Sequence, residues 1–361
     1  MGIYMQIWYK YLLQRFMMSV IFLTLLCFSL FICIDLITHI KELLDPTTRW
    51  RTWIIYYACM LSYRLDILLP FAVATATSLL LPRLIRNNEL TPLFNAGLAL
   101  KTISRPFFVV AACCSILLLT NTQYIFPHAL QRFHAISASS FGRKKISSHL
   151  DKMGVILCKD GSRLFFGCHF SKKRQLKDVF WVRTPDCIFH IEQLNYFADR
   201  PVESYGIDVI ERTPNNDMKK TASYPYCEIP DLMLTPKEIK TAASDPKELS
   251  ISQLAFLVPR FGNSLSERAS EARTLLFQKL LSPLLALLAF LFPAPLCLRF
   301  ERRFPHASLV FFSLALLFCF MIAAQAFVVL TRAPLSFPAS ILLVPWLAAL
   351  FIGMRRVKRL L

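Results

Sequence analysis

Residues 86–97 have the residue types best suited to chemistry, and that chemistry is recognition rather than catalysis. The segment reads RNNELTPLFNAG and connects two strongly apolar runs. Its apolar members could insert into a groove on a soluble partner, with Glu89 making a polar contact. These apolar members are Leu90, Leu93 and Phe94. A solvated connector is the competing interpretation, and the residues alone favour it.

Motifs for catalysis or cofactor binding are absent from the sequence. It contains no P-loop, dinucleotide-binding, zinc-protease or nucleophile-elbow motif. With 9 glycines, the chain has too few to build several phosphate-binding loops. Cys158, Cys168, Cys187 and Cys227 lie in the polar middle without the CxxC spacing typical of zinc or redox sites. We therefore expect no catalytic residue, metal or cofactor, while these cysteines could be disulfides or core thiols.

The composition indicates a membrane protein. Hydrophobic residues make up 55% of the 361 residues, which is too apolar for an ordinary soluble domain. Six runs are long enough to cross about 30 Å of hydrocarbon, the second only with help from its flanks. They cover residues 16–40, 67–81, 106–125, 275–298, 307–330 and 335–354. A signal peptide is the alternative for the first run, but this run is longer than a normal signal-peptide core.

The distribution of basic residues predicts the orientation. Cytoplasmic loops of membrane proteins are enriched in Lys and Arg. With the N-terminus inside, cytoplasmic ends carry Lys10, Arg15, Arg83, Arg86, Lys101, Arg105, Arg299, Arg302, Arg303, Arg355, Arg356, Lys358 and Arg359, against Lys41, Arg49, Arg51, Arg64 and Arg332 on the opposite side. This asymmetry predicts that both termini are cytoplasmic and explains much of the net charge of +18.

The polar middle of the chain is predicted to be a translocated, strand-rich domain. Asp160-Gly161 between two apolar runs is typical of a tight hairpin, and further short strand-forming runs follow. They predict a β-sandwich or a related all-β module, after which Ser250 could cap a helix. The predicted domains are residues 1–126 with a cytoplasmic element at 83–105, the β-rich domain 127–274, and helices in 275–361.

Several segments together resemble the LptF/LptG permease family, also called YjgP/YjgQ, over nearly the full length. They are the N-terminal IWYKYL at 7–12, LPFA at 69–72, SISQL at 250–254, QKLLSP at 278–283, the basic run 299–303, Pro338 and PWL at 345–347. In the cytoplasmic element, the positions that match the family pattern are Arg86, Asn88, Glu89, Leu90, Ala96 and Gly97.

This resemblance implies a permease half of an ABC transporter in the bacterial inner membrane. Expected partners are a sister permease, a cytoplasmic ATPase dimer, a single-span accessory protein and lipopolysaccharide. The inserted β-jellyroll would pass the lipid to a periplasmic bridge. ATP hydrolysis would occur in the partner, and the ATPase-coupling residues would be Arg86, Glu89, Leu90, Leu93, Phe94 and Gly97.

Two prolines depart from the family pattern near this element. Pro82 precedes Arg83, and Pro92 lies inside the expected coupling helix. Proline is tolerated in the first turn of a helix but not in its interior. We therefore expect the coupling helix to begin near Thr91.

Lysine and arginine residues near the outer interface are candidates for lipid binding. Lipopolysaccharide carries anionic phosphates above its acyl chains, and Lys41, Arg49 and Arg51 are placed to meet them. Simple snorkelling of these long side chains is equally compatible with the sequence. Asp35 and His39 are four residues apart, which predicts a local structural interaction on one helix face.

Two alternatives of other classes stay open from the residues alone. An ion-coupled secondary transporter would need buried acidic groups and broken helices near the midplane, and the apolar runs contain few acidic groups. A membrane-anchored enzyme of envelope lipid metabolism could carry a catalytic group in the polar middle that no motif reveals.

Overall fold

The computed structural model describes most of the chain. The described residues are 2–38, 50–140, 154–158, 162–170, 174–184, 186–197, 201–213, 217–229, 232, 234, 239, 242, 246–260, 267–297, 306–332 and 343–360. They belong to two compact units, one made of Met1–Phe141 with Leu265–Leu361 and the other of Gly142–Ser264. The predicted boundaries were 127 and 274; they differ because the helices Phe126–Ser140 and Glu267–Leu281 lie in the first unit from end to end.

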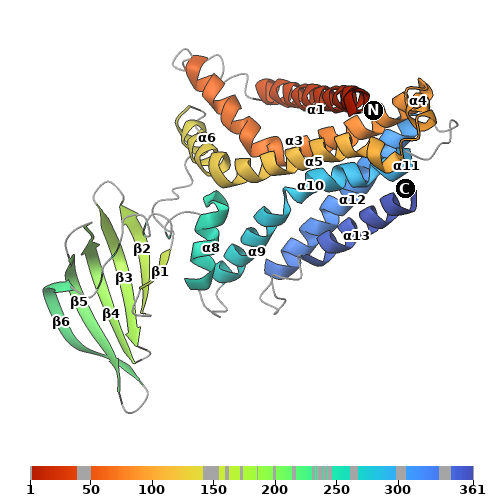
Figure 1. Ribbon diagram of the computed structural model, residues 1–361. Helices are drawn as coiled ribbons and strands as arrows, with labels where there is room; N and C mark the ends of the chain where they lie inside the picture. Colours follow the sequence, from red (N-terminus) through yellow and green to blue (C-terminus); the bar gives the residue numbers. More distant parts are fainter. Residues whose placement is uncertain are drawn as a thin grey trace. The chain divides into compact units, whose positions relative to one another are not determined.

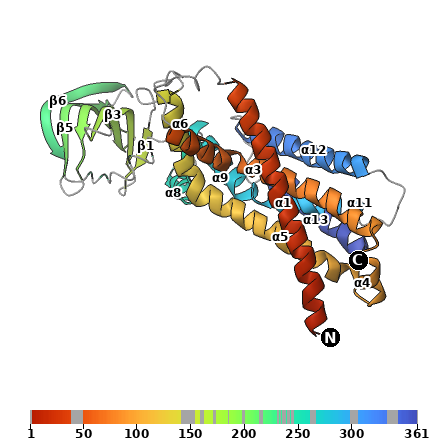
Figure 2. The same cartoon turned by 90° about the horizontal axis from the view of Figure 1, so that it is seen from above.

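Helices make up the first unit (Figure 1). In chain order they are α1 (Gly2–Thr38), α3 (Trp50–Arg86), α4 (Thr91–Asn95), α5 (Leu100–Thr120), the π-helical turn η1 (Asn121–Ile125), α6 (Phe126–Ser140), α9 (Glu267–Leu281), α10 (Leu284–Leu291), α11 (Pro293–Cys297), α12 (His306–Arg332) and α13 (Leu343–Leu360). Figure 2 shows α1 crossing over α3 and α5, and α1 contacts both helices.

The six predicted spans are confirmed only in part. Within the described residues, four helices are long and apolar enough to cross a membrane, or five if a bent pair counts as one span. That pair, Ser270–Leu281 and Leu284–Cys297, is bent by 48°, and Pro283 stands at the break. Proline causes such bends because it removes a backbone hydrogen bond and clashes with the preceding turn. The described apolar part of α13, Leu343–Gly353, is shorter than a span.

Helix α3 is the central element of the helical unit. It is continuous from Trp50 to Arg86 and passes through Pro70 and Pro82, so it is far longer than the predicted span 67–81. In its most apolar stretch 61% of the residues are buried, against 6% for α1. An apolar helix with so little cover must face lipid or another protein. Helix α1 is therefore the most exposed of the candidate spans.

Buried hydroxyl and amide groups tie α3 to its neighbours. The side-chain amide of Asn121, in the π-helical turn, donates to the carbonyl oxygen of Ser62 at 3.0 Å, and the Ser62 hydroxyl donates back to Asn121 Oδ1 at 2.8 Å. The hydroxyls of Ser78 and Ser313 lie 2.6 Å apart and connect α3 to α12. Because buried polar groups are costly when unpaired, these pairs fix the alignment of the helices.

The second unit contains a six-stranded antiparallel sheet with the strands in sequence order. The strands are β1 (Gly154–Leu157), β2 (Arg163–Phe170), β3 (Gln175–Thr184), β4 (Cys187–Asn195), β5 (Val202–Arg212) and β6 (Met218–Ile229). The β1–β2 hairpin is confirmed, and the Cys158 amide donates to the Ser162 carbonyl at its turn. The described strands form a meander rather than the predicted jellyroll, because short connections place each strand beside the next.

One face of the sheet carries the core of this unit. Leu164, Phe166, Leu176 and Val179 are fully buried there, together with residues that follow β6, such as Ile239. The sequence left open whether the cysteines of the polar middle form disulfides. All four are free thiols: Cys158, Cys168, Cys187 and Cys227. The predicted cap is confirmed: before helix α8 (Ile251–Arg260), Ser250 and Gln253 form a reciprocal capping box.

Candidate functional site

The end of α3 sets the position of Glu89. Asn88 adopts a left-handed conformation with φ of 57°, which asparagine tolerates better than most residues. The amide of Asn88 donates to the Ile85 carbonyl at 3.1 Å, and the amide of Glu89 donates to the Leu84 carbonyl at 3.0 Å. This bonding pattern is a Schellman motif, so the last turn of α3 holds the backbone of Glu89 in one place.

A second turn of the same type closes α4. Gly97 has φ of 78°, its amide donates to the Phe94 carbonyl, and the Leu98 amide donates to the Leu93 carbonyl. The helix begins at Thr91 with Pro92 in its first turn, as the sequence predicts. Gly97 therefore has a structural role here, since glycine adopts a positive φ at no steric cost.

The apolar residues of the element face the helical unit itself. Leu90 is only 2% exposed and belongs to the main core, while Leu93 and Phe94 are partly buried and pack against that core. The exposed residues are Arg86, Asn87, Asn88, Thr91, Pro92, Asn95, Ala96 and Gly97. We call Arg86, Asn87, Thr91, Pro92 and Asn95 the outer face of the element.

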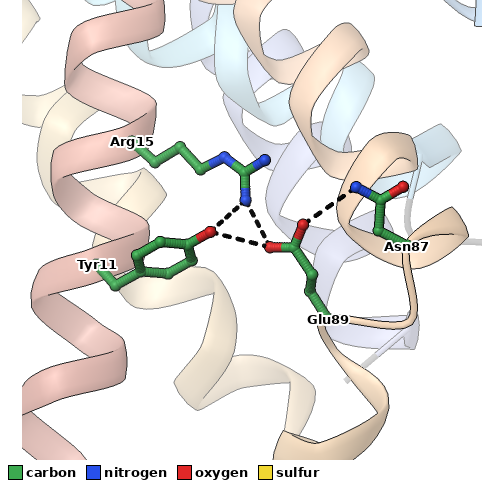
Figure 3. Close-up of polar contacts among 4 residues, drawn as sticks. All are labelled: Tyr11, Arg15, Asn87 and Glu89. Atoms are coloured by element: carbon green, nitrogen blue, oxygen red, sulfur yellow. Dashed lines mark hydrogen bonds and ion pairs between the residues drawn. The ribbon is translucent and has the colours of Figure 1, made fainter.

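Glu89 connects this element to α1 (Figure 3). Its Oε2 atom accepts from Arg15 Nη1 at 2.5 Å and from the Tyr11 hydroxyl at 3.2 Å, and Arg15 also donates to that hydroxyl. Its other oxygen accepts from the Asn87 side-chain amide at 3.2 Å. Tyr11 and Arg15 are one helical turn apart, so both reach the carboxylate from the same face of α1.

The surroundings of Glu89 favour its charged form. Partial burial by itself raises the pKa of this carboxyl, but hydrogen bonding from Asn87 and the charge and hydrogen bonds of Arg15 and Tyr11 outweigh burial and lower it. The ion pair is therefore fully present at neutral pH, and its contribution to stability is lost only as the pH falls through this lowered pKa.

Arg15 and Tyr11 contact Glu89 but were not among the site residues predicted from the sequence. They lie 74 and 78 residues before Glu89, so no local pattern relates them to it. The available signal was their spacing of four residues on a helix beside a membrane boundary. An acidic residue elsewhere on the same side of the membrane is the natural partner for such a cation.

The residues predicted to bind lipid are only partly described. Arg51 lies in the first turn of α3, is exposed, and has its guanidinium over the Trp50 ring at 5.7 Å. Lys41, Arg49 and His39 lie outside the described residues, so the predicted pair of Asp35 with His39 stays a prediction. Asp35 interacts with Tyr57 of α3, which places this acidic group against protein.

Comparison with known families decides the assignment. The family model for the lipopolysaccharide export system permease LptF/LptG matches residues 10–359. The chain belongs to the LptF/LptG family. The match covers both units and includes Tyr11, Arg15 and the whole 86–97 element. No curated protein sequence matches the chain.

Membership of the LptF/LptG family makes this chain a membrane permease of lipopolysaccharide export. The family consists of transport permeases rather than enzymes, which agrees with the lack of catalytic motifs in the sequence. Among the described residues, no group of three or more His, Cys, Asp or Glu side chains could hold a metal ion. The candidate site of this LptF/LptG permease is the contact of Glu89 with Tyr11 and Arg15 of α1.

Proposed function

We propose that the chain is one permease half of an ATP-driven lipopolysaccharide exporter, in which Glu89 couples an ATPase to α1. The contact of one carboxylate with both Tyr11 and Arg15 carries the proposal. A charge-assisted contact of this kind is directional and stronger than a neutral hydrogen bond. Movement imposed on the element is thereby transmitted to the cytoplasmic end of α1.

The outer face of the element is the surface on which a cytoplasmic ATPase dimer would act. Two Schellman turns fix the ends of the element, and Leu90 anchors it to the helical core. An element held at both ends moves as a rigid body, so a displacement imposed by the ATPase reaches Glu89 without deforming the element. In this proposal Glu89 faces inward to α1, whereas Arg86 and Asn95 face the ATPase.

Helix α1 would line the cavity that receives the lipid. Its central stretch carries exposed apolar side chains, including Phe22, Leu25, Leu26 and Leu30. Helix α12 is the other sparsely covered span, with 17% of its most apolar stretch buried. A cavity between these helices and a sister permease would offer apolar walls to acyl chains. Arg51, together with Lys41 and Arg49, would bind the phosphates above them.

The proposed orientation places both termini and the 86–97 element in the cytoplasm, and the β unit in the periplasm. The excess of Lys and Arg at the ends assigned to the cytoplasm supports this orientation. The six-stranded sheet would then receive the extracted lipid and pass it to a periplasmic bridge. The sister permease and a single-span accessory protein would be the other membrane partners in the complex.

The experiment that tests this function begins with affinity purification of the tagged chain in mild detergent. We expect an ATPase and a second LptF/LptG permease to co-purify. The complex, reconstituted in proteoliposomes, should release lipopolysaccharide only when ATP is hydrolysed. Release driven by an ion gradient without ATP would support the secondary-transporter alternative and overturn the proposal.

A further inference from the structure

The two halves of α1 are held by different kinds of contact. In the inner half, Leu12, Phe16 and Val20 are at most 2% exposed and belong to the main core. From Ile21 to Thr38, no described residue of α1 is buried. Lipid chains are as apolar as these side chains, so packing against protein gains little from the hydrophobic effect. The position of the outer half therefore depends on the few specific contacts that it makes.

Arg64 of α3 makes one of these contacts. Its guanidinium carbon lies 4.9 Å from the centre of the Phe31 ring of α1 and 4.9 Å from the centre of the Tyr63 ring. Among the described residues, its Nε atom is buried without a hydrogen-bond partner. The ring faces therefore help to hold this charge, because they carry the negative part of the aromatic quadrupole. Asp66 also acts on the charge, but it belongs to α3 itself, so Phe31 extends the contact to α1.

Aromatic rings of α3 and α6 hold the other side of this contact in place. The Tyr63 ring stacks on Phe126 and Phe133 of α6, with centroid separations of 6.0 and 6.1 Å. Phe133 also stacks on the buried ring of Tyr56 at 5.0 Å, and Phe31 packs against the cluster that contains Tyr56. Helices α3 and α6 thus form a packed aromatic platform, to which α1 contributes the single ring of Phe31.

The contact lies at the outer edge of the hydrocarbon in the proposed orientation. Arg64 precedes Arg86 by 22 residues of the same helix, which is about 33 Å at the helical rise per residue. This length is close to the roughly 30 Å thickness of the hydrocarbon core. One turn beyond Phe31, Asp35 of α1 interacts with Tyr57 of α3. The specific contacts of the outer half of α1 are therefore found where lipid of the outer leaflet would enter the proposed cavity.

We propose that Arg64 is a positioning residue that clamps the outer half of α1 against α3 in the nucleotide-free permease. Loss of the contact with Phe31 releases the outer half of α1, while the inner half stays packed in the core. The consequence rests on the proposed function, since the clamp would then control the access of lipopolysaccharide to the cavity. The clamp itself is a property of this chain alone.

Spin-label distances in the nucleotide-free transporter complex in nanodiscs test the clamp. Labels are introduced as unnatural amino acids at Ile34 of α1 and Val329 of α12, which are 56% and 66% exposed. Arg64→Gln removes the charge, and Phe31→Leu removes the ring but keeps an apolar side chain. Each should raise the ratio of displaced to native distances about thirtyfold, the equivalent of one desolvated cation–π contact. Phe31→Tyr keeps the ring face and should keep the native distances.

A double variant and two controls separate the clamp from general packing. Arg64→Gln combined with Phe31→Leu should shift the distances no further than either single variant, because both remove the same contact. Tyr124→Leu removes a ring of the π-helical turn that is 68% exposed, and it should change nothing. The distance from Met18 to Val329 should stay constant in every variant, because the inner half of α1 is held by the core.

Additive shifts of the two single variants would overturn the proposal, since they would mean that Arg64 and Phe31 act independently. Unchanged distances in Arg64→Gln would also overturn it, and loss of lipopolysaccharide binding in that variant would then assign Arg64 to the lipid phosphate instead. ATP-driven release is measured on the same samples. The clamp is measured without nucleotide and the exporter function only with ATP, so the failure of one is distinguishable from the failure of the other.

Discussion

Arg15→Glu is expected to reduce ATP-driven lipopolysaccharide release at least about tenfold, and adding Glu89→Arg is expected to restore most of it. The single substitution places two negative side chains together in a partly buried position, where like charges repel strongly. A hydrogen-bonded contact to a charged group contributes roughly 1.5–3 kcal/mol, and about 1.4 kcal/mol corresponds to a factor of ten. The double variant re-forms the pair with the charges exchanged, so the coupling between the two helices returns.

The control for these two variants is Arg83→Glu. It reverses the charge of an exposed side chain at the end of α3 and leaves the Glu89 contact intact. We expect it to change release by less than about twofold. ATPase content and activity of each purified complex are measured in parallel. If the double variant releases no more lipopolysaccharide than Arg15→Glu alone, Glu89 acts on the ATPase rather than on α1, and the proposed transmission is wrong.

Phe166→Ala is expected to destabilise the β unit by about 3–5 kcal/mol, the usual cost of removing a buried phenylalanine ring. The Phe166 side chain is fully buried in the core of the sheet. Gly154 of β1 lies directly against the ring, so the substitution removes a contact between β1 and β2. Hydrogen exchange of β2 and β3 in the full chain, measured by mass spectrometry, should accelerate by at least about a hundredfold.

Phe170 provides the matched control on the same strand. It is 36% exposed, so Phe170→Ala should cost less than about 1 kcal/mol and alter exchange little. Equal effects of the two substitutions would show that the face carrying Phe166 is not the core of this unit. Release of lipopolysaccharide should fall in Phe166→Ala while assembly of the helical unit is retained, because the two units are separately compact.

Features determined by neighbouring residues were predictable from the sequence. The β1–β2 hairpin follows from Asp160-Gly161, the start of α8 follows from Ser250, and the start of α4 follows from Pro92. Each depends on hydrogen bonds or dihedral angles within a few residues, which local sequence specifies directly. The family assignment was also predictable, because it depends on the order and spacing of several such segments.

Features determined by distant contacts were not predictable in this way. Leu90 was predicted to be an anchor for a partner, but a short amphipathic helix has an apolar face whether that face meets another chain or its own core. The pairing of Glu89 with Arg15 depends on how α1 crosses α3, which no pattern in either segment specifies. The break at Pro283 could have been suspected from the proline itself, yet the apolar run continues through it.

The most direct test of the coupling is a set of spin-label distances in the reconstituted complex, with and without trapped nucleotide. Labels introduced as unnatural amino acids at Met18 of α1, Asn95 of α4 and Phe312 of α12 occupy exposed positions. We predict that nucleotide trapping changes the distance from Met18 to Phe312 while the distance from Met18 to Asn95 stays constant. The opposite result is that the distance from Asn95 to Phe312 changes while the distance from Met18 to Phe312 stays constant. That result would contradict transmission from the element to α1.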